Sequence, residues 1–65
     1  MTYEVFLSKV VGFSHAENVL FTVSEDRDEG KLVAVFSNGV RFVANHISKA
    51  ITVLWASGHQ SVYRV

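Results

Sequence analysis

The segment Lys31–Val43 constrains the fold more than any other part of this sequence. Two runs rich in valine and phenylalanine flank the dipeptide Asn38-Gly39. Asparagine followed by glycine suits the two positive-φ positions of a type I′ turn, which joins antiparallel strands through a two-residue loop. The segment therefore predicts a tight β-hairpin within a β-rich domain.

A two-residue loop also sets the pairing, because it places Ser37 opposite Val40 and Val35 opposite Phe42. One face of the hairpin then carries Val33, Val35, Val40, Phe42 and Ala44, and the other carries Leu32, Ala34, Phe36, Arg41 and Val43. A sheet with one solvated side normally shows polar residues on that side. Both faces are apolar here apart from Arg41, so we expect a helix, the far side of a rolled barrel or another subunit to cover the second face.

The chain is small for the apolar surface that it carries. Of its 65 residues 49% are hydrophobic and 18% are charged, whereas a typical domain has about 25% charged residues. It has no cysteine, so neither disulfides nor a cysteine-ligated metal supplements the core. We expect one domain over residues 1–65 that buries its excess apolar surface by self-association or against a protein partner.

Charge and hydropathy exclude several classes of function. Six basic residues balance six acidic ones, whereas nonspecific nucleic-acid binders need an excess of lysine and arginine. No run of apolar residues is long enough to cross a membrane. The first residues lack the basic region and the small-residue cleavage site of a signal peptide. We therefore expect a cytoplasmic protein that does not bind membranes.

The first third of the chain is interpreted as extended. Apolar and polar residues alternate over residues 2–11, which predicts a first strand that ends at Gly12. Ser14 and Glu17 have the spacing of a helix capping box. Because β-branched residues follow soon afterwards, any helix there is short, and a strand over Val19–Ser24 is at least as well supported.

Residues 24–30 form the one cluster of charged residues. Four acidic side chains surround Arg27, and Gly30 closes the segment. The acidic residues do not have the spacing of a calcium-binding loop. We interpret the segment as a solvated acidic turn without an ion site.

The last third of the sequence is compatible with two structures. Residues 51–65 have the pattern of a second hairpin that turns at Ser57-Gly58 or Gly58-His59. Either turn places Ile51, Val53, Trp55 and Val62 on one face, opposite Leu54, Tyr63 and Val65. The alternative is a helix over residues 45–57, although its β-branched residues disfavour that structure. We favour one helical turn over His46–Ala50 followed by a strand.

No combination of residues has the pattern of an active site or a metal centre. His15, His46 and His59 do not have the spacing of a known metal-binding motif. Ser14, His15 and Glu17 include the residue types of a catalytic triad, but neighbours in sequence rarely assemble its geometry. A chain of this size also has little room for a pocket of about 300 Å³ or more. We expect no enzymatic activity, no cofactor and no metal.

Aromatic and basic side chains are the best candidates for a binding surface. Most phenylalanines are expected to fill the core, whereas tryptophan and tyrosine are enriched at interfaces. The candidate binding residues are Phe36, Arg41, Lys49, Trp55, Tyr63 and Arg64. The aromatic residues suit a protein partner, and their combination with the cations also suits the stacked bases of a single-stranded nucleic acid.

The predicted fold is all-β: a small, partly open antiparallel barrel of about five strands, of SH3-like or OB-like size, with one short helical turn near Ile47. The alternative is an α+β fold, in which one helix near residues 45–57 covers an antiparallel sheet. The expected function is that of a non-enzymatic protein-binding module or small regulatory protein that forms homo-oligomers. The alternative is a small β-barrel that binds single-stranded nucleic acid by aromatic stacking and a local basic patch.

Overall fold

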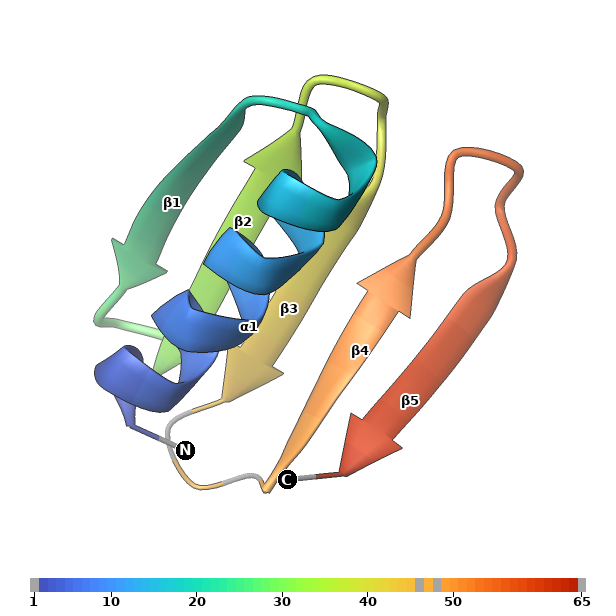
Figure 1. Cartoon of the computed structure of the whole chain (residues 1–65). Coiled ribbons are helices and arrows are strands. Elements are labelled where there is room, and N and C mark those ends of the chain that lie inside the picture. Colours follow the sequence, from blue (N-terminus) through green and yellow to red (C-terminus); the bar gives the residue numbers. More distant parts are fainter. Residues whose placement is uncertain (1, 46, 48, 65) are drawn as a thin grey trace.

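The computed structural model describes residues 2–45, 47 and 49–64. Its elements are α1 (Tyr3–Glu17), β1 (Phe21–Asp26), β2 (Lys31–Phe36), β3 (Arg41–Asn45), β4 (Ala50–Leu54) and β5 (Gln60–Arg64). The strands form one antiparallel sheet in the order β1-β2-β3-β4-β5 (Figure 1). The prediction of a small β-rich fold with five antiparallel strands is confirmed.

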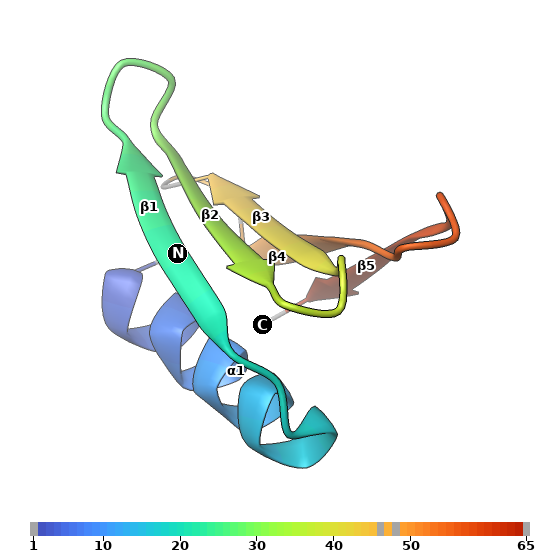
Figure 2. The same ribbon diagram turned by 90° about the horizontal axis from the view of Figure 1, so that it is seen from above.

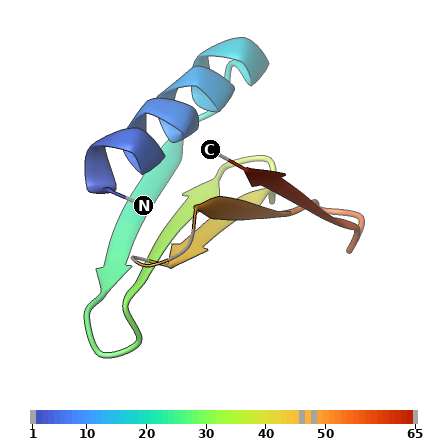
Figure 3. The ribbon, with the colours of Figure 1, turned by 90° about the horizontal axis from the view of Figure 1, so that it is seen from below.

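The sheet is open and does not close into a barrel. β1 and β5 each pair on one side only, so both are edge strands. The sheet twists strongly, and α1 lies against one of its faces (Figures 2 and 3). One helix on an antiparallel sheet is the architecture of the α+β alternative, but the helix precedes the sheet instead of spanning residues 45–57. Because α1 covers the apolar face, the sheet buries that face without closing on itself.

Residues 3–11 lie in α1, so the first strand predicted over residues 2–11 is wrong. The side chains that pack on the sheet are Phe6, Val10 and Phe13, which have the spacing of one helical face. Thr2 caps the helix, because its Oγ1 accepts a hydrogen bond of 3.3 Å from a backbone N–H of the first turn. Complete burial of Phe6 and Val10 stabilises the helix more than valine and phenylalanine, as weak helix formers, destabilise it.

Ser14 and Glu17 lie at the end of α1, so the interpretation of these residues as a capping box is wrong. The Ser14 hydroxyl donates a hydrogen bond to the carbonyl oxygen of Val19. Asn18 has a left-handed φ of 53°, and its N–H and that of Val19 bond to carbonyls of the last helical turn, as in a Schellman motif. Gly12, which was expected to end a strand, lies inside the helix.

The hairpin of β2 and β3 is present, but its loop has three residues, 37–39, instead of two. The N–H of Phe36 donates to the carbonyl of Val40 at 2.9 Å, and the N–H of Gly39 donates to the carbonyl of Phe36 at 3.0 Å. Gly39 has a φ of 90°, whereas Asn38 is not among the residues with positive φ. The loop is therefore a turn followed by a left-handed glycine, and the predicted type I′ turn is wrong.

The longer loop shifts the pairing by one residue, so that Ala34 pairs with Phe42 and Val33 with Val43. Such a shift changes which residues of the two strands share a face. The inner face, which α1 covers, carries Leu32, Ala34, Phe36, Val40, Phe42 and Ala44, all buried. The outer face carries Val33, Val35, Arg41 and Val43. Each of the two predicted faces combined inner-face residues of one strand with outer-face residues of the other, so the predicted faces are wrong.

The second hairpin is confirmed as β4 and β5, and its loop is of the same type as the first. The N–H of Trp55 donates to the carbonyl of His59, and the N–H of Gly58 donates to the carbonyl of Trp55, both at 2.9 Å. Gly58 has a φ of 91°. The pairing again differs from the predicted register, so Tyr63 and not Val62 lies on the inner face.

β4 contradicts the alternative helix over residues 45–57. It begins at Ala50 and lies between two other strands, where its β-branched residues suit an extended backbone. The predicted helical turn over His46–Ala50 lies partly outside the described residues. The strand predicted over Val19–Ser24 is present as β1, which begins and ends later in the chain.

Candidate functional site

α1 covers only part of the inner face. It packs mainly on β2, and β4 and β5 continue the sheet beyond the helix (Figures 1 and 3). Between α1 and this extension lies a partly open cavity of about 300 Å³, which we call the groove. It is lined by Lys9, Phe13, Phe42, Ile51, Val53, Trp55, Tyr63 and Arg64. A chain of this size was expected to lack such a volume, and the space exists because the sheet is wider than the helix that covers it.

Packed aromatic rings form the apolar part of the groove. The Phe13 ring from α1 meets Phe42 at a centroid distance of 5.1 Å and Trp55 at 6.2 Å, while its contact with buried Phe36, at 4.6 Å, ties it to the core. The Trp55 Nε1–H donates a hydrogen bond of 3.0 Å to the Ser61 hydroxyl. The hydrogen bond to Ser61 of β5 and the contact with the Phe13 ring therefore both fix the orientation of the indole.

Lys9 and Arg64 are the charged residues that line the groove, and no described acidic residue lines it. Within the described part of the chain neither of them takes part in an ion pair, the one present being that between Lys31 and Glu29. Cations beside apolar walls produce a stronger field than the same cations in open solvent. The arrangement favours a ligand that combines an apolar body with an acidic group.

Three of the six candidate binding residues come together in the groove. Trp55 directly follows β4 and Tyr63 lies in β5, and both side chains line the groove on the inner face of the second hairpin. Tyr63 is 54% exposed, so its ring remains available for contact with a ligand. Arg64 follows at the end of β5 and completes this side of the groove.

The other three candidates lie elsewhere. Phe36 is 2% exposed and belongs to the core, so a partner does not reach its side chain in the folded protein. Arg41 is exposed on the outer face of β3, on the opposite side of the sheet from the groove. Lys49 is exposed in the connection from β3 to β4 and does not line the groove.

Lys9 and Phe13 contribute to the groove but were not predicted. They are four residues apart in α1, so they lie on one side of the helix, one turn from each other. The interpretation of residues 2–11 as a strand concealed this spacing. Phe6, Val10 and Phe13 have the spacing of one helical face. This spacing is the signal in the sequence that predicts a helix, and a helix places Lys9 beside Phe13.

The histidines and Ser14 form no catalytic or metal-binding cluster in the described part of the chain. His15 is exposed in the last turn of α1, and His59 is exposed at the start of the β5 side of its hairpin. His46 lies outside the described residues. No group of three histidine, cysteine or acidic residues among those described is placed to hold a metal ion.

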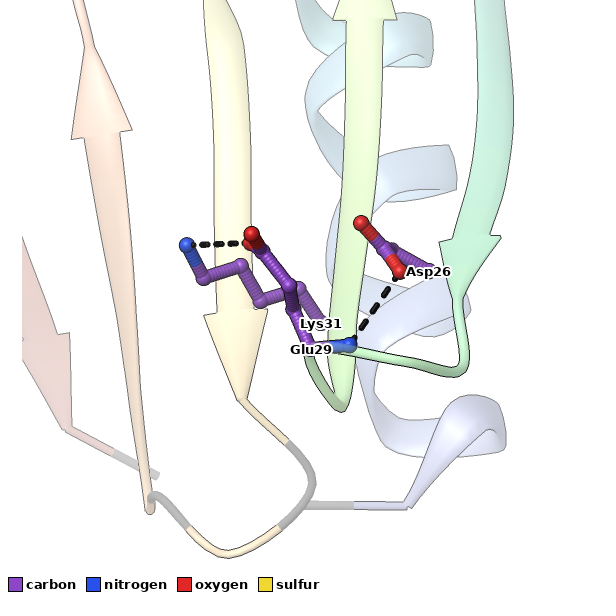
Figure 4. A network of polar contacts seen from close by, with 3 residues as sticks. All are labelled: Asp26, Glu29 and Lys31. Carbon is purple, nitrogen blue, oxygen red and sulfur yellow. Dashed lines mark hydrogen bonds and ion pairs between the residues drawn. The ribbon is translucent and has the colours of Figure 1, made fainter.

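The acidic turn between β1 and β2 is held by its own side chains (Figure 4). Asp26 Oδ1 accepts a hydrogen bond of 3.2 Å from the backbone N–H of Glu29. Lys31 Nζ lies 2.9 Å from Glu29 Oε2. The hydrogen bond to Glu29 and the negative charge of that residue raise the pKa of Lys31 above its usual value. These two carboxylates thus have partners within the turn itself.

Comparison of the chain with protein-family models, with curated proteins and with solved structures finds no match. Among the residues that the structure describes, no helix has the length and apolar character that crossing a membrane requires.

Proposed function

We propose that this protein is a non-enzymatic protein-binding module whose groove takes an apolar, acidic segment of a partner protein. One observation carries the proposal: a cavity of about 300 Å³ has apolar walls and, as charged lining, Lys9 and Arg64. Concave, mostly apolar sites with a few polar groups are the usual form of a ligand site. An exposed apolar surface lowers the solubility of a chain with few charged residues, so its presence supports a role in binding a partner.

The apolar walls favour one bulky side chain as the anchor of the partner segment. Trp55 and Tyr63 flank the groove, and Ile51 and Val53 form a buried floor behind them. Tryptophan and tyrosine are enriched among the residues that dominate binding energy. Full burial of one leucine or phenylalanine side chain contributes about 1.5–3 kcal/mol.

The two cations favour a carboxylate on the same segment. Lys9 comes from the helix, and Arg64 lines the groove from the end of β5, at a position that alternates with Tyr63 and therefore lies at the edge of the groove. Charges at the rim of an interface mainly select the partner and speed its association, and they add little affinity. We therefore expect a bound segment to require acidic residues and to prefer them over basic ones.

The residue types of the lining support a binding function over catalysis. Among the described lining residues there is no carboxylate, histidine, cysteine or serine. A nucleophile with an adjacent general base is therefore not available within the groove.

The fluorescence of Trp55, the single tryptophan of the chain, tests this proposal directly. The probe is a synthetic peptide that alternates leucine with threonine and carries two aspartates. We expect it to shift the emission of Trp55 and to bind more weakly to Tyr63→Ser. The matched control is Tyr3→Ser, because Tyr3 is 46% exposed, similar to Tyr63, but does not line the groove.

A second set of titrations tests the role of charge. The peptide with lysines in place of its aspartates should bind more weakly to the wild type, and Lys9→Glu should reduce or reverse that preference. Equal binding of both peptides, or equal loss in Tyr63→Ser and Tyr3→Ser, would contradict the proposal. The nucleic-acid alternative stays a prediction, and salt-sensitive binding of oligothymidylate in preference to the acidic peptide would favour it.

A further inference from the structure

The two edges of the sheet differ in how well they are protected. The β1 edge ends in Glu25 and Asp26, and Glu25 occupies an inner-face position opposite Leu32. Charged residues, and inward-pointing ones above all, prevent further strands from pairing with an edge. β5 has one charged residue, Arg64, at its end, and α1 does not lie beside it (Figures 1 and 3). β5 is therefore the unprotected edge of the sheet.

The hydrogen bonds of β5 leave a regular set of backbone groups facing outward. Trp55 donates to the carbonyl of His59, which makes this pair a hydrogen-bonded one. Because such pairs alternate along an antiparallel ladder, Ser61 and Tyr63 also bond to β4. The N–H and C=O groups of Gln60, Val62 and Arg64 therefore point away from β4, toward the open edge.

We propose that β5 pairs in antiparallel fashion with β5 of a second copy of this chain, with the two-fold axis at Val62. In this register the outward groups of Val62 bond to those of Val62 in the second copy, and Gln60 faces Arg64. The register uses the whole of β5 and keeps the two Arg64 side chains apart, which matters because like charges directly opposite destabilise a strand pair. The contact is the same on both copies, as closed two-fold symmetry requires.

The side chains of both faces fit this arrangement. On the outer face, Val33, Val43, Thr52 and Val62 form one cross-strand row that ends at the β5 edge, where Val62 is 61% exposed. In the pair of copies the row continues without a break from one sheet into the other. On the inner face, Tyr63 lies opposite Ser61 of the second copy, so each groove is extended by residues of the other copy.

Pairing uses the outward backbone groups of β5, whereas the groove uses the side chain of Tyr63 on the inner face of the same strand, so the two contacts are adjacent but distinct. The contact rests on a strand of five residues, whereas stable interfaces bury about 800 Å² on each partner. We therefore expect an association that depends on protein concentration in the micromolar range. A second copy is favoured over another protein because the sequence of β5 is complementary to itself in this register.

Sedimentation velocity over a range of concentrations tests the proposal with a pair of charge variants. The wild type should approach twice the chain mass of 7.2 kDa. Val62→Lys alone and Val62→Glu alone should each remain monomeric, since each places two like charges at the two-fold axis. An equimolar mixture of the two variants should restore the dimer, because lysine then faces glutamate.

Two controls keep the outcome interpretable. Val35→Lys changes a residue of the same type that is 45% exposed on the outer face of β2, away from the edge, so it should dimerise like the wild type. Circular dichroism establishes that every variant is folded. A wild type that stays monomeric at all concentrations, folded variants that dimerise alone, or a mixture that stays monomeric would each overturn the proposed pairing.

Discussion

Replacement of Gly39 by alanine tests the conformation of the β2–β3 loop. Gly39 has a φ of 90°, a region that residues with a Cβ rarely adopt, and occupying a left-handed conformation costs about 1–2 kcal/mol. The added Cβ would also lie 3.3 Å from the Cβ of Ala56 in the neighbouring hairpin loop. This contact is tighter than normal and adds up to about 1 kcal/mol, because two exposed loops can move apart slightly. We expect Gly39→Ala to destabilise the fold by about 1–3 kcal/mol.

Gly58 offers a matched control for the steric part of this effect. It occupies the same position in the same type of loop and has a φ of 91°, but a Cβ there would meet nothing within 4 Å. Gly58→Ala should therefore show the conformational cost alone, about 1–2 kcal/mol. In an Ala56→Gly background the contact is absent, so Gly39→Ala should cost the same as Gly58→Ala.

Urea unfolding followed by the fluorescence of Trp55 measures these differences. All variants are compared at one protein concentration, since association shifts apparent stability. A Gly39→Ala variant within about 0.5 kcal/mol of the wild type, the range of ordinary surface substitutions, would refute the left-handed loop. A cost at Gly39 that Ala56→Gly leaves unchanged would refute the steric argument.

Three further predictions follow from the same structure. Gly12→Ala should stabilise the protein by about 1 kcal/mol, because alanine is the better helix former and the added Cβ meets nothing within 4 Å; a loss of stability in urea would contradict a helix there. Phe36→Asp should unfold the chain, seen as loss of the circular dichroism of the sheet, because it places a charge in the core; a folded variant would contradict the inner-face assignment. Asp26→Asn with Asp28→Asn should leave the melting temperature unchanged with or without calcium, whereas calcium stabilisation of the wild type alone would contradict a simple acidic turn.

Much of the sheet was predictable, because short stretches of the sequence specify its turns. Gly30, Gly39 and Gly58 have positive φ and end the loops that join β1 to β2, β2 to β3 and β4 to β5. The antiparallel pairing of the strands that each of these loops joins follows from the loops. The exact loop length did not follow, because Asn38-Gly39 suits both a two-residue and a three-residue loop.

Three of the eight residues that line the groove were predicted as binding residues. Trp55, Tyr63 and Arg64 were identified from residue type, because large amphipathic side chains are typical of interfaces. Lys9 and Phe13 were missed because their role depends on a helix that places both against the sheet. Phe36, also a candidate, lies in the core, because residue type does not distinguish a core phenylalanine from a surface one.

The sequence by itself determined the turns that end at Gly30, Gly39 and Gly58 and the antiparallel pairing of the strands that they join, since both depend on local backbone preferences. Tertiary structure decided three other features. It made residues 3–17 a helix, because burial of Phe6 and Val10 on the sheet outweighs their weak local preference. It selected the inner face of each hairpin, because a shift of one residue exchanges the faces. It also created the groove, since that site requires side chains from α1, β3, β4 and β5 to converge in space.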